Sequence, residues 1–292
     1  MLMKRTIGSY AEQLFQDGFC IVPNMIAESK VAALHRDLAP VFEATPPSVG
    51  PFYGGGTRRF GSLLKRSRHT AAFVQHKLIL DIVEHALRPW CDRFQLNLTQ
   101  AIEISPGADM QPPHRDQDMW GGPKGEMEYL VNVMWPFNEY TIENGATRLW
   151  RGSHKRQNEI IMPEEEAIFA EMAPGAALLF LGSTLHGGSP NRSAAARRGM
   201  IISYCLGWLK PFENQWLVYP PSIARNFSPE LATLVGYFQH RPNLGNYEGR
   251  CPSILLEDEV PAYLEARDSL LPEQETLIAA YLAGELELGK AA

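Results

Sequence analysis

The sequence predicts a mainly β protein. Its core is a β-sandwich or jelly roll, and helices from the N-terminal part of the chain cover it. Two observations predict this fold class. Over residues 1–92 apolar side chains recur at helical spacing, whereas residues 93–210 consist of short apolar segments separated by turns. Helices that precede a series of short strands are typical of a jelly roll with a helical cover. Residues 211–292 follow as an extension, and we expect the chain of 292 residues to form a single domain.

The N-terminal part contains three predicted helices. They span residues 6–17, 29–42 and 70–87, where apolar residues return every three or four positions. An Asp-Gly pair ends the first helix, and a proline follows the third. Between the first two helices, residues 19–22 are predicted to form a short strand, because this segment is wholly apolar and ends at a proline.

A loop rich in Pro and Gly is predicted at residues 45–61. Such a composition favours turns over regular secondary structure. Two interpretations are open, because a loop of this kind can be a lid over a site or a plain surface loop. The Gly54-Gly55-Gly56 run within it does not indicate phosphate binding, since no Lys-Ser or Lys-Thr pair follows it.

The second part of the chain is predicted to form the strands of the jelly roll. The predicted strands lie at residues 94–104, 129–135, 149–150, 176–181 and 198–208. Turns such as Pro106-Gly107 and Pro174-Gly175 precede or follow them. In the extension, prolines interrupt short helical stretches, and the last predicted helix spans about 272–288.

Composition and charge exclude several classes of function. Apolar residues make up 45% of the chain and charged residues 21%, as in an ordinary globular protein. A net charge of -6 gives no basic excess for nucleic acid. The four cysteines form no C-x-x-C pair, so we expect reduced thiols, and no apolar run is long enough to span a membrane. We therefore expect a cytoplasmic monomer or small homo-oligomer that binds a small molecule.

Three residues carry the metal-binding chemistry of the sequence. His114 and Asp116 are two positions apart, and on an extended strand this spacing directs both side chains to the same face. His186, far along the chain, supplies a second imidazole. Two His and one carboxylate on one face of a metal form the facial triad of non-haem Fe(II) oxygenases, which leaves other positions open for a co-substrate and O2.

An H-x-D pair alone is a weak indication of a metal site, since any surface loop can contain one. The surroundings of His186 strengthen it, because an apolar predicted strand precedes this residue and Asn191, Ser193 and Arg197 follow it. His154, in a Gly-Ser-His-Lys turn, is predicted to have a structural hydrogen-bonding role. The other histidines have no suitably spaced partners and are interpreted as surface or helix residues; they are His35, His69, His76, His85 and His240.

Several motifs together resemble the phytanoyl-CoA dioxygenase family of Fe(II)- and 2-oxoglutarate-dependent dioxygenases. The segments that carry the resemblance are Gln111–Asp116, Glu143–Thr147, Gly152–Lys155 and His186–Tyr204. Their order and spacing agree with that family, and the similarity runs from about Phe15 to Trp208. The resemblance implies a double-stranded β-helix that uses Fe(II), 2-oxoglutarate and O2. It also implies that His114, Asp116 and His186 are the iron ligands.

The resemblance further implies an anchor for 2-oxoglutarate. Arg197 is implied to bind the distal carboxylate, and a guanidinium suits this role because its planar fork pairs a carboxylate bidentately. Arg198 is the competitor, since neighbours on a strand face opposite sides; Arg197 is preferred because it lies eleven positions after His186. Gln111 and Thr147 are placed to bind the co-substrate, with a plain loop residue and a plain strand residue as the alternatives.

The resemblance implies oxidation, foremost hydroxylation, of a small organic metabolite with release of succinate and CO2. Asp116 fills a position that a small residue takes in halogenating relatives, which favours hydroxylation or a related oxidation. We expect the substrate between the Gly-rich loop and residues 118–120, and a contribution of the C-terminal extension is left open. Two other hypotheses are a cupin-like hydrolase or isomerase that uses the same ligands for another metal, and a non-catalytic binding module with a vestigial site.

Overall fold

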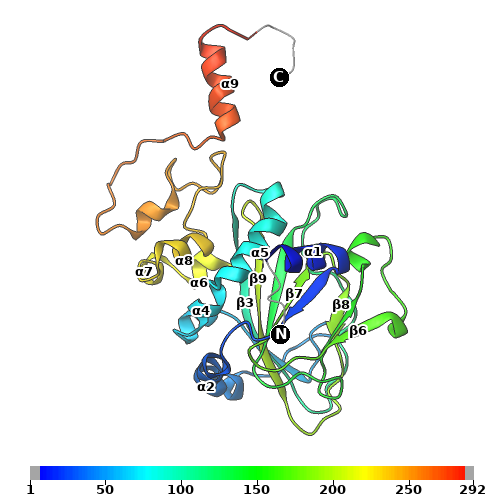
Figure 1. The fold of residues 1–292 in the computed structure, drawn as a ribbon. Coiled ribbons are helices and arrows are strands. Elements are labelled where there is room, and N and C mark those ends of the chain that lie inside the picture. The colour runs from blue at the N-terminus through cyan, green and yellow to red at the C-terminus, as the bar shows by residue number, and fades with distance from the viewer. Residues whose placement is uncertain (1–6, 287–292) are drawn as a thin grey trace. The chain divides into compact units, whose positions relative to one another are not determined.

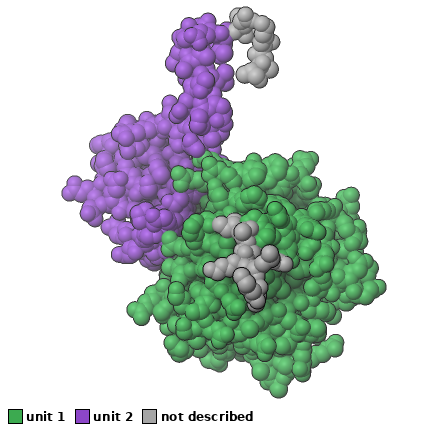
Figure 2. Space-filling model, viewed as in Figure 1, with its two compact units in different colours: residues 1–219 green, residues 220–292 purple. Residues whose placement is uncertain are grey.

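The computed structural model describes residues 7–286 (Figure 1). The chain forms two compact units, residues 1–219 and residues 220–292 (Figure 2). The first residue of the helix predicted at 6–17 and the last two of the helix predicted at 272–288 lie outside the described residues. Within the described part, no helix is long and apolar enough to cross a membrane.

The first unit is built on a six-stranded antiparallel sheet with the order β1-β7-β4-β9-β3-β2. Its strands are β1 (Phe19–Val22), β2 (Thr57–Phe60), β3 (Phe94–Ile104), β4 (Leu130–Pro136), β7 (Ala177–Leu181) and β9 (Arg197–Leu206). For every strand of this sheet except β2, the first and last residues differ by at most two positions from those of a predicted strand. β2 lies inside the segment predicted as a loop, and it forms because it pairs with β3.

A second, three-stranded antiparallel sheet has the order β6-β5-β8. Its strands are β5 (Thr147–Trp150), β6 (Ala167–Ala170) and β8 (His186–Gly188). The core contains buried apolar side chains of both sheets, among them Ile102, Met134 and Ile201 from the large sheet and Leu149 and Ala170 from the small one. Burial of this apolar surface stabilises the sandwich. The two antiparallel sheets with flanking helices confirm the predicted mainly β jelly-roll class.

Helices flank the large sheet, as Figure 1 shows. They are α1 (Ile7–Asp17), α2 (Glu28–Ala44), α3 (Leu63–Arg66), α4 (Thr70–Val74) and α5 (Lys77–Leu87). α1 contacts β1 and β7, and α5 contacts β4 and β9. The helix predicted at 70–87 is two helices, because His76 adopts an extended backbone and its ring bonds the carbonyl of Met25 at 3.1 Å.

Short helical turns complete the first unit. They are η1 (Arg88–Trp90), η2 (Asp116–Met119), η3 (Ser153–Lys155), η4 (Glu164–Glu166) and α6 (Gln215–Val218). Cys20, Cys91 and Cys205 are buried.

The described part of the second unit, residues 220–286, contains four short helices. They are α7 (Pro221–Ala224), α8 (Pro229–Leu234), η5 (Pro252–Leu256) and α9 (Pro272–Leu282). α8 begins at an N-cap, where the Ser228 side chain accepts a hydrogen bond from the Leu231 backbone N–H. The α7 and η5 helices contact each other, and Leu231 and Ile254 are buried. No residue of α9 is buried, so this helix presents side chains to solvent all round.

Candidate active site

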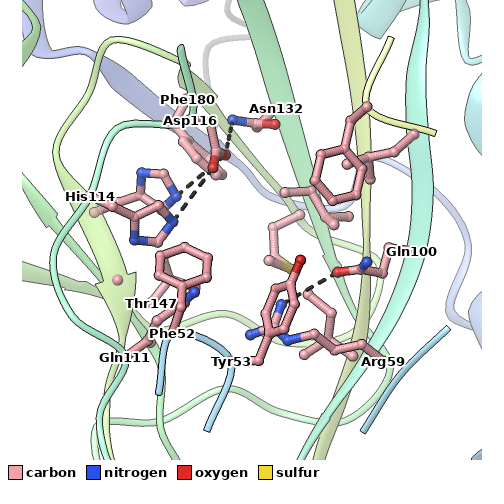
Figure 3. Close-up of a pocket in the computed structure, with 18 of the residues that line it drawn as sticks. Phe52, Tyr53, Arg59, Gln100, Gln111, His114, Asp116, Asn132, Thr147 and Phe180 are labelled. Atoms are coloured by element: carbon pink, nitrogen blue, oxygen red, sulfur yellow. Dashed lines mark hydrogen bonds and ion pairs between the residues drawn. The ribbon is translucent and has the colours of Figure 1, made fainter. Parts of the chain in front are cut away.

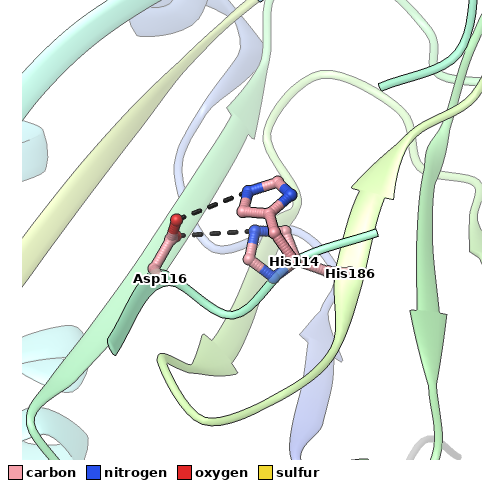
Figure 4. A group of neighbouring side chains, drawn as sticks. All are labelled: His114, Asp116 and His186. Atoms are coloured by element: carbon pink, nitrogen blue, oxygen red, sulfur yellow. Dashed lines mark ion pairs between the residues drawn. The ribbon is translucent and has the colours of Figure 1, made fainter. Parts of the chain in front are cut away.

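His114, Asp116 and His186 lie together and face one another (Figure 4). One ligand atom from each residue lies within 4.8 Å of the other two. The Nε2 atoms of His114 and His186 each lie 3.5 Å from a carboxylate oxygen of Asp116. Ligand atoms that share one metal ion at bonds of about 2.1 Å lie roughly 3 Å apart, so a small closure of this cluster suffices to bind a metal.

The backbone explains why these distant residues meet. His114 and His186 form an isolated antiparallel bridge, in which each N–H donates to the carbonyl of the other at 2.9 and 3.0 Å. Arg115 is extended, and the chain then turns into η2, which begins at Asp116. The predicted common direction of His114 and Asp116 is therefore observed, although Asp116 opens a 3-10 turn and is not part of a strand.

Hydrogen bonds fix the orientation of all three side chains. Nδ1 of His114 lies 2.9 Å from the carbonyl of Pro112, and Nδ1 of His186 lies 3.0 Å from that of Thr184. A carbonyl only accepts, so each Nδ1 carries the proton and each Nε2 lone pair is directed at the cluster. Asn132 Nδ2 donates to Asp116 Oδ2 at 2.9 Å. Such supporting bonds are typical around metal-binding His and carboxylate groups.

The protonation states also suit a divalent cation. Burial, aided by the charge of His114, lowers the pKa of His186 to about 4. Burial acts to raise the pKa of Asp116, but His186, His114 and the bond from Asn132 outweigh it and lower the pKa to about 2. At neutral pH the imidazole of His186 is neutral and Asp116 is ionised, as metal binding requires. Two imidazole nitrogens and a carboxylate fit Fe(II) by donor type and number.

All six predicted site residues line one pocket (Figure 3). They are Gln111, His114, Asp116, Thr147, His186 and Arg197. Thr147 is buried at the start of β5, and the backbone N–H of Gln111 donates to the Gly188 carbonyl at 2.9 Å, which holds the Gln111 segment beside β8. The structure thus brings the predicted co-substrate residues next to the predicted metal ligands.

Arg197, and not Arg198, faces this pocket. Arg197 is 2% exposed, its Nη1 donates to the Gly145 carbonyl at 2.6 Å, and its guanidinium lies 4.1 Å from the Tyr140 ring centroid. Its Nε has no hydrogen-bond partner among the described residues. Arg198 is bound instead by two carboxylates, at 2.6 Å to Glu103 and 2.7 Å to Glu43. The strand alternation therefore leaves Arg197 as the arginine available to a ligand.

Comparison with known proteins identifies the family. The family model described as phytanoyl-CoA dioxygenase (PhyH) matches residues 14–199. The chain belongs to the phytanoyl-CoA dioxygenase family. This match covers more than half of the 292 residues and includes every predicted site residue.

Relatives and solved structures agree with this family. The dioxygenase olcK of Penicillium canescens is 30% identical over 80% of this chain and 81% of its own, and the dioxygenase cdmA of Talaromyces verruculosus is 28% identical over 77% and 81%. The α-ketoglutarate-dependent epimerase SnoN from nogalamycin biosynthesis shares the fold with a TM-score of 0.58, at 16% identity over 70% of this chain and 86% of its own. The chain is an Fe(II)- and 2-oxoglutarate-dependent dioxygenase, as the sequence predicts.

Arg59 is a pocket residue of this PhyH-family protein that the sequence did not reveal. It lies on β2, its Nη1 is 3.4 Å from Gln100 Oε1, and its guanidinium is 5.1 Å from the Tyr53 ring centroid. Its Nε has no partner among the described residues, and it forms no ion pair with a described carboxylate. Burial, together with the positive charge of Arg197, lowers the pKa of Arg59 to about 10. The neighbouring Arg58 points elsewhere, to Glu103 at 2.6 Å.

The Gly-rich loop contributes to the wall of the pocket. Phe52 and Tyr53 line it, and the Phe52 ring packs edge-on against His114 with the centroids 4.7 Å apart. Of residues 118–120, Met119 lines the pocket. Trp120 stacks instead on Tyr129, with ring centroids 6.0 Å apart, so this part of the predicted substrate region turns away.

His154 is not part of the site. Its Nε2 lies 2.8 Å from the carbonyl of Phe15, which ties the turn that contains η3 to the end of α1. The predicted structural hydrogen bond is therefore present.

Proposed function

We propose that this pocket catalyses the oxidation, foremost the hydroxylation, of a small organic molecule, with release of succinate and CO2. The observation that carries the proposal is that one pocket combines a two-His, one-carboxylate cluster with two guanidiniums that have no described carboxylate partner. The first set suits Fe(II), and the second suits a dicarboxylate. 2-Oxoglutarate is the dicarboxylate co-substrate of this class of enzyme.

In this proposal His114, Asp116 and His186 would hold Fe(II) and leave the rest of the pocket to the co-substrate and the substrate. The metal, when bound, supplies the O2 chemistry that amino-acid side chains cannot perform. The carbonyls of Pro112 and Thr184 keep the two imidazoles in the binding tautomer. Orientation fixed in this way lowers the reorganisation needed when the metal binds.

Arg197 is proposed to anchor one carboxylate of 2-oxoglutarate. Its buried guanidinium stays charged and can form a bidentate pair, which is stronger and more directional than a pair with an ammonium group. Thr147 and Gln111 offer a hydroxyl and an amide on the same side of the pocket. Arg59 supplies a second cation, which balances the second negative charge of the co-substrate.

The aromatic residues of the Gly-rich loop are proposed to limit water near the metal. The Phe52 ring packs against His114 and lines the pocket, and 43% of this residue is exposed to solvent. Exclusion of water strengthens the electrostatic contacts within the pocket and protects the substrate from side reactions. This supports the lid interpretation of residues 45–61.

A screen of candidate metabolites for stimulated succinate release tests the proposal. We expect one class of compound to raise succinate release above the level with 2-oxoglutarate alone, and His114→Ala to abolish it. Release of a hydrolysis or isomerisation product without 2-oxoglutarate would favour the cupin-like alternative. A cytoplasmic location, the oligomeric state and the single-domain organisation stay predictions from the sequence.

A further inference from the structure

The part of the pocket beyond the metal ligands and the two arginines is lined mainly by apolar side chains. They include Leu98, Ile102 and Ile104 from β3, Leu130 and Met134 from β4, Phe180 from β7 and Ile201 from β9. Phe52, Met119 and Phe212 complete this apolar lining. Three of them are large apolar side chains left open to solvent, with exposed fractions of 43% for Phe52, 41% for Met119 and 50% for Phe212. An apolar molecule in the pocket would cover this surface and remove it from water, which favours binding.

Most polar groups in this part of the pocket already have partners. Asn97 Nδ2 donates to Ser203 Oγ at 3.2 Å, and its Oδ1 accepts from the Phe212 backbone N–H at 2.7 Å. Asn132 is bonded to Asp116. A ligand that competes for these amides must first break bonds that hold the strands and the metal ligand in place. These asparagines therefore shape the pocket and offer little to a substrate.

Gln100 is an exception. Its Oε1 accepts from Arg59, which fixes the orientation of the amide, and no described residue accepts a hydrogen bond from its Nε2. The side chain lines the pocket from β3 and is partly exposed (Figure 3). Gln100 Nε2 is therefore a donor that a ligand oxygen can satisfy.

In the proposed function, the charged groups of the pocket bind the co-substrate and the metal. Among the described residues that line the pocket, the charged side chains are Arg59, Asp116 and Arg197. If these hold the co-substrate and the metal, a charged group on the substrate meets no described side chain of opposite charge. Transfer of an unpaired ion from water into such a site is unfavourable.

We infer that the substrate is an uncharged, largely apolar organic molecule that accepts a hydrogen bond from Gln100 through a carbonyl, ether or hydroxyl oxygen. The inference rests on the proposed function, because it assigns Arg59 and Arg197 to 2-oxoglutarate. It excludes free carboxylates and acyl-CoA thioesters as preferred substrates.

Matched pairs of compounds that differ only in charge test the inference. Palmitic acid, abietic acid and a steroid carboxylic acid are each compared with their methyl esters. Their affinity for the full chain with Fe(II) and 2-oxoglutarate, without O2, is measured by calorimetry. We expect the esters to bind at least about tenfold more tightly than the acids. The inference is overturned if the acids bind as tightly as the esters, or if no ester binds.

The role of Gln100 is tested by a second comparison. Gln100→Leu should weaken methyl abietate about tenfold, the value of one hydrogen bond, and should leave the oxygen-free hydrocarbon abietadiene unaffected. Gln95→Leu, on the same strand but outside the pocket, is the matched control and should leave the ratio of the two affinities unchanged. Equal weakening of both ligands by Gln100→Leu would overturn the assigned hydrogen bond. Binding of 2-oxoglutarate to the Fe(II)-loaded chain, measured before any ester is added, tests the proposed function separately.

Discussion

Nε of Arg115 donates to the carbonyl of Ser183 at 3.0 Å, and this bond joins the two segments that carry the metal-binding residues. Arg115 stands between His114 and Asp116, and Ser183 precedes His186 by three positions. The side chain of Arg115 is thus directed away from the metal cluster while its neighbours face it. Only 6% of the residue is exposed.

The remaining donors of Arg115 bind a third segment. Nη1 donates to the carbonyl of Glu159 at 2.9 Å, and Nη2 donates to those of Ser153 and Arg156 at 3.2 and 3.1 Å. All the partners are backbone carbonyls, and together they need the planar fork of a guanidinium. A lysine ammonium at the same place cannot reach all of them.

Arg115→Lys should therefore lower the affinity for Fe(II) or Co(II) by about 10- to 100-fold, as is usual when support around a metal ligand is lost. Anaerobic titration followed by calorimetry and by Co(II) absorption measures this change. Arg156→Lys is the control, because Arg156 lies in the same loop but pairs with exposed Glu159 and Glu166. Unchanged metal affinity in Arg115→Lys, or an equal loss in the control, would contradict the positioning role.

Arg197→Ala should raise the concentration of 2-oxoglutarate needed for half-maximal turnover by about 100-fold, since a charged hydrogen-bonded pair is lost from a buried site. Metal affinity should be retained. Arg198→Ala should leave the 2-oxoglutarate requirement unchanged and lower the thermal stability, because Arg198 pairs with Glu103 and Glu43. If instead Arg198→Ala raises the requirement, the assigned anchor is wrong.

Because Glu128 is a buried carboxylic acid, we expect the stability of the fold to depend on pH. The Oε2 atom of Glu128 accepts from Ser183 Oγ at 2.5 Å, and burial raises the pKa of Glu128 from 4.5 to about 7. Between these two values the folded chain binds more protons than the unfolded chain, so the free energy of unfolding falls as pH rises. In total the free energy of unfolding falls by about 3 kcal/mol, because each tenfold change in proton affinity corresponds to about 1.4 kcal/mol.

Glu128→Gln removes this titrating group and should make the variant progressively more stable relative to the wild type as pH rises from 4.5 to 7. Urea unfolding across that range measures the difference. Glu126→Gln, at an exposed position nearby, should show no such trend. A difference between Glu128→Gln and the wild type that does not change with pH would refute the assignment.

Phe52→Ala should weaken binding of apolar ligands roughly tenfold, because a large apolar surface of the pocket is lost. Val49→Ala, in the same loop but at a side chain that is 91% exposed, should leave the affinity unchanged. Calorimetry with methyl abietate measures the affinity of each of these two variants. Equal affinities of the wild type and Phe52→Ala would exclude a substrate-facing role for the loop.

The metal cluster could be predicted from the sequence because its chemistry is local. The residue types and spacing of His114 and Asp116 suit a shared ligand, and the resemblance to the family linked them to His186. The choice between Arg197 and Arg198 depended on the register of two strands. In the structure Arg198 lies opposite Glu103 and Arg197 opposite Ile104, so the acidic residue on β3 pairs with Arg198 and leaves Arg197 for the pocket.

Arg59 could not be predicted, because the strand that presents it has no signal of its own. β2 lies in a segment whose Gly and Pro content indicates a loop, and only its pairing with β3 makes it a strand. Arg58 lies opposite Glu103 and Arg59 opposite Ile102, so tertiary contacts decide which of the two arginines reaches the pocket. The same dependence on a partner strand explains why β6 and β8 were not predicted.

The most direct test of the central claim is anaerobic absorption spectroscopy of the chain titrated with Fe(II) in the presence of 2-oxoglutarate. We expect a weak visible charge-transfer band that saturates at one Fe(II) per chain, disappears in His186→Ala and persists in His69→Ala. Absence of the band in the wild type, or its full retention in His186→Ala, would contradict the claim that His114, Asp116 and His186 hold the iron to which 2-oxoglutarate binds.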